Sequence, residues 1–272
     1  MKIIKINIIV LIFLYFSSLR LSAQCFERNF AFSVGEKLTY DVYYNWGFLW
    51  LSAGWVEFRV DETKYKNRDV YFFDSFGSSH KGYDWFFKVR DSYETYMDMQ
   101  TLRPLWFERK TNEGGYEAHE VYLFEPGEKK VYSFTENSNR AFRKDTLIYP
   151  PCTVDVLSLI YYARNIDFSS IPVNDTVPVT ILIDNEFFNF YIRYRGKEDI
   201  ETKDGVKYHC LKFSALLVEG TIFKSGEDLF VWVTDDKNRI PVLVESRILV
   251  GSVKAYLSKA EGLRNKTTSK IN

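Results

Sequence analysis

The feature that most constrains the fold is a regular alternation of apolar and polar residues along most of the chain. In the stretch EKLTYDVYYNW, every second residue from Leu38 to Trp46 is apolar, and Thr39, Asp41 and Asn45 lie between them. Successive side chains of a β-strand point to opposite faces, so a period of two is that of a half-buried strand. The stretch therefore predicts a strand with one apolar face.

The same alternation recurs along the chain, and short turn-forming segments separate the runs. EGGY, EPGEKK, KDGVK and KSGED are such segments, rich in glycine and in residues that favour turns. About a dozen or more strands at this spacing are typical of an antiparallel sandwich or barrel. We predict a mainly β fold, an antiparallel curved sheet or half-open, barrel-like fold.

One segment departs from the alternation. CTVDVLSLIYYARNIDF contains no glycine or proline. If this segment forms a helix, apolar residues lie around nearly its whole circumference. A helix that is apolar all round is a buried helix. We therefore expect one buried helix from about Thr153 to Asn165. No linker divides the chain, so residues 25–262 are expected to form a single domain. The polar tail 263–272 is expected to be disordered.

The first residues, 1–24, have the pattern of a secretory signal peptide. Lys2 and Lys5 precede an apolar run, and a polar segment with small residues, SSLRLSAQ, follows it. The run is short for a transmembrane helix, and a second apolar run does not follow, so no transmembrane segment is expected in the mature chain. The protein is predicted to be exported, and to be periplasmic or associated with the outer membrane.

The three cysteines also bear on the compartment in which the protein is located. Cys25 follows LSAQ and could carry a lipid anchor, but Gln24 stands where a lipoprotein site has a small residue. In an oxidising compartment an odd number of cysteines allows one internal bridge and one free thiol. Cys25 lies at the expected N-terminus of the mature chain and Cys152 in an expected loop after two prolines, so both are expected to be accessible and we favour a disulfide between them. Cys210 lies within an expected strand and is interpreted as a small buried residue.

The charge of the chain gives no reason to expect a nucleic-acid partner. The sequence has 36 basic and 36 acidic residues, and loss of Lys2, Lys5 and Arg20 leaves a slight acidic excess. A basic amphipathic helix that would bind anionic lipid is not evident either.

A search for catalytic motifs finds no nucleophile elbow, zinc-binding helix or phosphate-binding loop. The three histidines, at 80, 119 and 209, are too scattered for a metal cluster, so no metal and no cofactor are expected. Most carboxylates lie beside glycine or asparagine and are interpreted as turn residues; the candidates considered are Asp84, Asp91, Glu94, Glu113, Asp184, Glu186, Asp235 and Asp236. Asp84 is expected to pair with Arg90 or Lys88.

Aromatic residues make up 18% of the chain, which is high enough to need an explanation. They either fill a large β core or line an apolar cavity of the kind that binds lipids, hydrophobic small molecules or sugars. Two segments, NWGFLWLSAGW and YDWFFKV, concentrate them. The candidate ligand-binding residues are Trp46, Trp50, Trp55, Trp85, Phe86 and Phe87.

Four stretches together resemble the "domain of unknown function 3108" family, DUF3108, of exported proteins of Gram-negative bacteria, in its Bacteroidetes form. They are FSVGEKLTYDVYYNWGFLWLSAGWVEF, YDWFFKVRDSYETYMD, PPCTVDVLSLIYYARN and GTIFKSGEDLFVWVTDDKNRIPVLVES. The resemblance covers roughly Phe32 to Leu257. It implies a mostly antiparallel, curved, barrel-like fold, and it implies no catalytic residue, since the family has no established activity.

These observations lead to three hypotheses about function. The first is a non-enzymatic envelope protein that binds or carries an apolar or amphipathic ligand, which requires an internal void. The second is a structural or protein-interaction component of the cell envelope, which predicts a packed interior and an exposed apolar patch. The third is a carbohydrate-binding or carbohydrate-active protein, which predicts exposed tryptophan faces.

Overall fold

The computed structural model describes residue 25 and residues 28–217, 226–248 and 251–271. The predicted signal peptide, residues 1–24, lies outside the described residues. The side chains of Trp46 and Leu49 are also not described.

One curved sheet contains all the strands, and its first half is an antiparallel meander. Each strand pairs with the next along the chain. The strands are β1 (Lys37–Trp46), β2 (Leu49–Tyr65), β3 (Arg68–Ser79), β4 (Val89–Asp98), β5 (Pro104–Glu113), β6 (Tyr116–Glu125), β7 (Lys130–Asn137) and β8 (Arg140–Ile148). Between β3 and β4 the chain forms the short helices η1 (Lys81–Tyr83) and α2 (Asp84–Phe87).

The second half is a meander that runs back toward the first. Its strands are β9 (Thr153–Val154), β10 (Thr176–Ile183), β11 (Glu186–Glu201), β12 (Lys207–Leu217), β13 (Gly226–Thr234), β14 (Pro241–Arg247), β15 (Ser252–Glu261) and β16 (Lys270–Ile271). Strand β15 pairs with β1 and joins the two halves, while β9 pairs parallel to β10 and β16 pairs with β12. The helices α3 (Val156–Ala163) and η2 (Phe168–Ser170) lie between β9 and β10.

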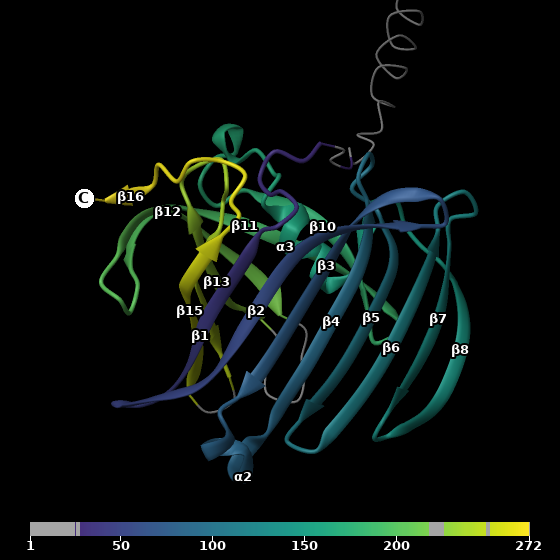
Figure 1. The fold of residues 1–272 in the computed structure, drawn as a ribbon, viewed down its shortest axis with the longest axis horizontal. Coiled ribbons are helices and arrows are strands. Elements are labelled where there is room, and N and C mark those ends of the chain that lie inside the picture. Colours follow the sequence, from purple (N-terminus) through teal and green to yellow (C-terminus); the bar gives the residue numbers. More distant parts are fainter. Residues whose placement is uncertain (1–24, 26–27, 218–225, 249–250, 272) are drawn as a thin grey trace, which may run out of the picture.

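The sheet is curved but open. Its strand order runs from β8 through β1 and β15 to β9, so β8 and β9 are its two edges and do not pair with each other. Figure 1 shows the strands bending around the space in which α3 lies. Register shifts between Val42 and Tyr43 and between Tyr194 and Gly196 mark β-bulges, which increase the local bend of a strand. The predicted mainly β, half-open fold with one buried helix is confirmed.

Helix α3 packs against one face of the sheet, which we call the inner face. The helix begins at Val156 and not at Thr153, because the Asp155 side chain accepts a hydrogen bond from the Ser158 backbone N–H and caps it. Asp155 also accepts hydrogen bonds from the hydroxyls of Ser158 and Thr95, at 2.6 and 2.9 Å, and so ties the helix to β4. Ile160 is 38% exposed, so the helix is buried on most sides but not on all.

Aromatic stacking joins α3 to the sheet. The rings of Tyr161 on α3 and Phe73 on β3 are stacked with centroids 3.9 Å apart. Phe32, which precedes β1, contacts both rings edge-on. The core around them consists of large apolar residues from the inner face of β2–β7, from α3 and from β10: Val60, Met97, Phe107, Tyr122, Phe124, Val131, Leu157 and Leu182. This core lies between α3 and the inner face of the sheet.

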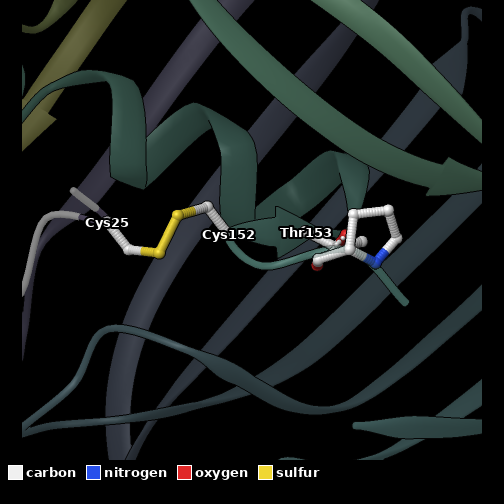
Figure 2. The surroundings of a disulfide bond; sticks show 4 residues. Cys25, Cys152 and Thr153 are labelled. Carbon is white, nitrogen blue, oxygen red and sulfur yellow. Dashed lines mark hydrogen bonds between the residues drawn. A yellow bond between two sulfur atoms is a disulfide. The ribbon is translucent and has the colours of Figure 1, made fainter. Parts of the chain in front are cut away.

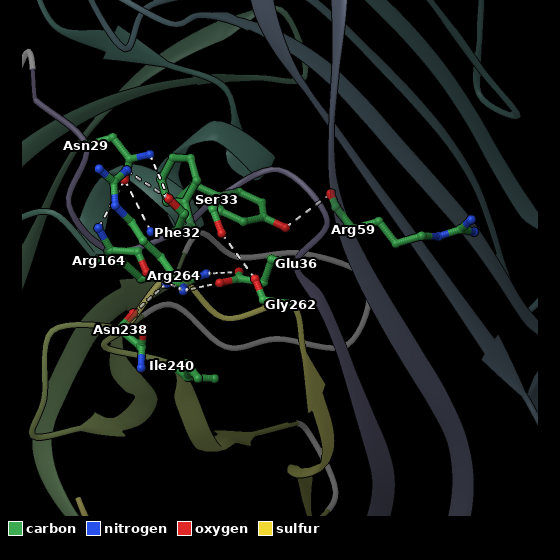
Figure 3. A network of polar contacts seen from close by, with 12 residues as sticks. Asn29, Phe32, Ser33, Glu36, Arg59, Arg164, Asn238, Ile240, Gly262 and Arg264 are labelled. Carbon is green, nitrogen blue, oxygen red and sulfur yellow. Dashed lines mark hydrogen bonds and ion pairs between the residues drawn. The ribbon is translucent and has the colours of Figure 1, made fainter. Parts of the chain in front are cut away.

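A buried ion pair holds the C-terminal end of α3. The Arg164 guanidinium donates to both carboxylate oxygens of Glu36, at 2.5 and 2.9 Å, and both side chains are almost completely buried. Arg164 also donates to the backbone carbonyls of Asn238 and Ala31. Figure 3 shows how this group joins the segment before β1 to the turn between β13 and β14.

A disulfide holds the other end of the helical segment. Cys25 and Cys152 are bonded, with Cα atoms 5.3 Å apart, and they are the two cysteines favoured from the sequence. Figure 2 shows the bridge in front of α3, next to Thr153. The Thr153 hydroxyl donates to the Pro150 carbonyl at 2.7 Å and fixes the turn that carries Cys152. Cys210 is buried and free.

The prediction of a disordered C-terminal tail is wrong. Asn265 exchanges two hydrogen bonds of 2.9 Å with Asn238, and Ser269 is 2% exposed and donates to Asp236. Strand β16 then pairs with β12. The polar residues that suggested a solvated tail are the partners of the turn between β13 and β14, so composition alone was misleading.

Candidate functional site

The predicted ligand-binding aromatics are distributed over two different parts of the sheet. Across paired strands, residues in register point to the same side, and the pairs of Trp50 with Asn45 and of Trp55 with Asp41 place both tryptophans on the outer face. Trp50 is 43% exposed, and Trp55 packs against Phe76 with ring centroids 5.6 Å apart. Trp50 and Trp55 therefore do not line the space around α3.

The other three aromatics lie on α2, at the lower end of the sheet in Figure 1, which we call the lower rim. Trp85 is 83% exposed and Phe86 is 73% exposed. Phe87 instead covers Gly114 in the turn between β5 and β6. A Cβ atom on Gly114 would lie 2.4 Å from the Phe87 ring, and its φ of +61° favours glycine as well.

A polar cluster holds α2 in place on the lower rim. Asp84 accepts hydrogen bonds from both terminal nitrogens of Arg90, at 2.7 and 3.2 Å, and from the Ser79 hydroxyl at 2.6 Å. The Ser79 hydroxyl and the Arg90 guanidinium hold the pKa of Asp84 below its usual range. The expected pairing of Asp84 with Arg90 is confirmed, and it fixes the helix that exposes Trp85 and Phe86.

Near the lower rim, the inner face changes from apolar to polar. Tyr93 on β4, Arg109 on β5 and Glu120 on β6 are neighbours in register, one strand after another. On the same face, Asp91 lies one position closer to the rim than Tyr93 on β4, and Glu113 lies two positions closer than Arg109 on β5. Most of the candidate carboxylates are interpreted from the sequence as turn residues, but Asp91 and Glu113 belong to strands whose inner face is polar at this end.

The turn between β10 and β11 reaches across to this polar surface. Arg109 donates to the Asp184 carboxylate at 2.5 Å and its Nε lies 3.2 Å from the Glu120 carboxylate. The Asn185 backbone N–H donates to the Tyr122 hydroxyl at 3.1 Å, and its side-chain amide donates to Asp145 on β8 at 3.0 Å. These contacts bring the second half of the sheet against the inner face of the first half, near its open edge.

Burial makes two carboxyl groups of this surface unusually weak acids. Desolvation raises the pKa of Asp91 to about 7, and the neighbouring Glu113 carboxylate adds to the effect. Desolvation also raises the pKa of Glu120 to about 7, although Arg109 opposes it. Arg109 Nε and Glu120 Oε2 form an ion pair, whereas two other buried polar atoms of this region, Ser133 Oγ and Asn185 Oδ1, have no hydrogen-bond partner within the described chain. The inner face therefore holds acids that titrate near neutral pH and hydrogen-bonding capacity that the protein does not use.

These pKa values predict how stability depends on pH. A carboxyl group whose pKa is higher in the folded than in the unfolded state stabilises the fold while protonated, and this contribution disappears as the pH rises through the folded-state pKa. We expect the free energy of unfolding to fall between about pH 4 and about pH 7. Asp91→Asn keeps the group neutral and should flatten this slope, whereas Asn at the exposed Asp69 should not. Urea unfolding at a series of pH values measures the slope, and an unchanged slope in Asp91→Asn would contradict the assignment.

No group of three or more histidine, cysteine or acidic side chains is arranged to hold a metal ion among the described residues. Likewise, none of the described helices has the length and apolar character needed to cross a membrane.

Comparison with known proteins gives a family and a related fold. Among solved structures, the chain is similar to the crystal structure of a β-barrel-like protein of domain of unknown function DUF1849 from Brucella abortus. The TM-score is 0.54 at 10% sequence identity, over 85% of this chain and 98% of the other, which shows a shared fold only. No curated protein matches the chain. Residues 39–258 match the family described as "Protein of unknown function (DUF3108)", so the chain belongs to the DUF3108 family.

Proposed function

We propose that this protein is an exported, non-enzymatic protein of the cell envelope that binds an amphipathic ligand at its lower rim. The observation that carries the proposal is the pair of solvent-exposed rings, Trp85 and Phe86, held by α2 beside an inner face that is polar at the same end. An amphipathic ligand has one part suited to each surface.

The exposed rings provide the apolar part of the site. Exposing large aromatic rings to water is unfavourable, by roughly 25 cal/mol for each Å² of apolar surface. The two rings are not on a loosely held loop, because Asp84, Arg90 and Ser79 fix the helix that carries them. A rigid exposed apolar group loses little conformational entropy when a ligand covers it, and so favours binding.

The inner face provides the polar part and selects its chemistry. Four carboxyl groups, on Asp91, Glu113, Glu120 and Asp184, face one guanidinium, on Arg109. Such a surface accepts hydrogen bonds more readily than it donates them. It therefore suits a head group with amine, hydroxyl or amide donors, and it repels a phosphate or carboxylate head group.

Binding fits this surface better than catalysis does. The side chain of Glu120 is 4% exposed and lies against Arg109, and the carboxyl of Asp91 lies beside Glu113. These acids interact with one another and with Arg109 on the inner face, so they set its polarity, and the exposed Asp184 carboxylate is the most accessible of the four. Export is supported by the disulfide between Cys25 and Cys152, a bond that is typical of oxidising compartments, and by the signal-peptide pattern of the sequence at residues 1–24.

The test compares what the protein carries when purified from envelopes under gentle conditions. Native and denaturing mass spectrometry of the wild type should differ by a bound species, which extraction then identifies as a lipid, another amphiphile or a glycan. The double variant Trp85→Ser, Phe86→Ser should lose most of that species. Phe76→Ser is the matched control, because Phe76 is 38% exposed but lies on the outer face of β3, where it packs against Trp55. Equal loading of all three proteins, or no bound species in the wild type, would contradict the proposal.

A second function has its own supporting observation. Phe48, in the turn between β1 and β2, is 99% exposed, and this turn lies at the same end of the sheet as α2. Three exposed aromatics at one end of the sheet also suit a protein partner in the envelope. In that case Trp85→Ser, Phe86→Ser would abolish crosslinking of α2 to one specific protein, while the wild type would carry no bound small molecule.

A further inference from the structure

A second aromatic cluster lies on the outer face of the sheet, on the opposite side from α3. It consists of Tyr43 on β1, Trp50 on β2 and Tyr256 on β15. Because β1 pairs with both β2 and β15, the three rings come from three adjacent strands. The rings of Tyr43 and Tyr256 meet edge-on, with centroids 5.9 Å apart. We call this group the outer cage.

The outer cage already surrounds a cation. The Lys203 ammonium lies 5.0 Å from the centroid of each of the three rings. A cation within about 6 Å of a ring face is attracted by the negative face of the π system. A site at which three rings meet one ammonium group is the arrangement by which proteins recognise quaternary and methylated ammonium groups.

The rings are the principal partners of Lys203. In the described part of the chain its ammonium makes no ion pair, whereas the nearby Lys254 pairs with Glu245 at 3.0 Å. The Lys254 ammonium lies 5.3 Å from the Trp50 ring, so the same ring attracts two cations. Attraction to the rings alone does not require the N–H groups of lysine, and a fully methylated ammonium satisfies it equally well.

Lys203 can leave the cage without disrupting its own turn. The turn between β11 and β12 is closed by the Thr202 N–H, which donates to the Val206 carbonyl at 2.9 Å, and by the Gly205 N–H, which donates to Thr202 at 3.0 Å. The Thr202 hydroxyl also donates to the Val206 carbonyl. None of these bonds involves the Lys203 side chain, which is solvent-exposed.

We propose that the outer cage is a binding site for a methylated ammonium group, such as that of a choline-bearing molecule, and that Lys203 occupies it in the unliganded protein. Lys203 then acts as an internal competitor. A quaternary ammonium gives up less hydration than a primary ammonium when it enters the cage, and its methyl groups fill more of the space between the rings. The cage lies on the face opposite the inner polar surface, so this proposal does not depend on ligand binding at the lower rim.

The test measures binding of tetramethylammonium and choline by saturation-transfer NMR and calorimetry. Lys203→Ala should bind both about tenfold more tightly than the wild type, since it removes the competitor. Lys212→Ala is the matched control, because Lys212 also lies over a ring, Trp232, at 4.7 Å, but outside the cage. This variant should bind as the wild type does.

Two further comparisons separate recognition of charge from simple apolar contact. The neutral isostere of choline, 3,3-dimethylbutan-1-ol, should bind neither the wild type nor Lys203→Ala. Trp50→Ala in the Lys203→Ala background should abolish binding, and Trp50→Phe, which keeps a ring, should restore part of it. The proposal is overturned if Lys203→Ala fails to bind tetramethylammonium, or if the neutral isostere binds as well as choline.

Discussion

Replacing Arg164 with methionine is expected to lower the free energy of unfolding by about 3–5 kcal/mol, among the largest effects of any single substitution in this chain. The change removes one partner of an ion pair and leaves the Glu36 carboxylate, whose side chain is 1% exposed, without a counter-charge. A buried charge that has lost its partner bears the full cost of desolvation, whereas an intact pair recovers much of it.

The position of Arg164 increases this cost. Its guanidinium also donates to the Asn238 carbonyl at 3.0 Å and to the Ala31 carbonyl at 3.3 Å. One side chain thus joins the end of α3, the segment before β1 and the turn between β13 and β14, as Figure 3 shows. Its loss leaves buried acceptors unpaired on two segments that are far apart in the sequence, the segment before β1 and the turn between β13 and β14.

A double-mutant cycle distinguishes an unpaired charge from lost packing. Glu36→Leu with Arg164→Met replaces the pair by apolar side chains and should be more stable than either single variant. Arg264→Met is the matched control, because Arg264 also donates to a carbonyl of this region, that of Phe32 at 3.2 Å, but has no buried carboxylate partner. It should cost about 1 kcal/mol in urea unfolding. A double variant less stable than both single variants would show that the pair itself is the main source of stability.

Alternation in the sequence was sufficient to predict the sheet, because a period of two depends only on which face of each strand is buried. The location of the tryptophans depends on more than the period. Trp50 and Trp55 are an odd number of residues apart and would lie on opposite faces of a regular strand. The β-bulge opposite Val42 and Tyr43 adds one residue to β2 and turns both rings to the outer face. A bulge has no clear signature in a single sequence. The sequence alone therefore could not show that Trp50 and Trp55 lie on the outer face and not in the interior.

The polar inner face was missed for a related reason. Asp91, Arg109 and Glu120 alternate with outward-facing residues as apolar core residues would, but a charged residue in an alternating run is normally assigned to the solvent side. Strand pairing places these residues in register, and the turn at Asp184 covers them from the other half of the sheet. Long-range pairing of this kind cannot be derived from local pattern. The tail illustrates the same limit, since its partner Asn238 is 27 residues away from Asn265.

Loss of the disulfide is expected to be the other large effect. Cys25 and Cys152 are separated by 127 residues, so the bond restricts a long loop of the unfolded chain. Loop-closure entropy for a loop of this size corresponds to about 4–5 kcal/mol, and removal of native disulfides typically costs about 2–5 kcal/mol. The bond also fixes the start of the described chain next to the turn that precedes α3, where the Asp155 cap begins the helix.

Three variants isolate the contribution of this bond. Cys25→Ser, Cys152→Ser and the double variant should lose the same free energy of unfolding, because each removes the same cross-link, and reducing agent should lower the wild type to their level. Cys210→Ala is the control. Burial raises the pKa of the Cys210 thiol to about 12, so this thiol should be unreactive in the folded protein and should not exchange with the bridge. If reduction leaves the unfolding midpoint of the wild type unchanged, the bond adds no net stability and the prediction is wrong. If the single variants differ from each other, the free thiol left in one of them forms a new contact, and the double variant then gives the value for the bond.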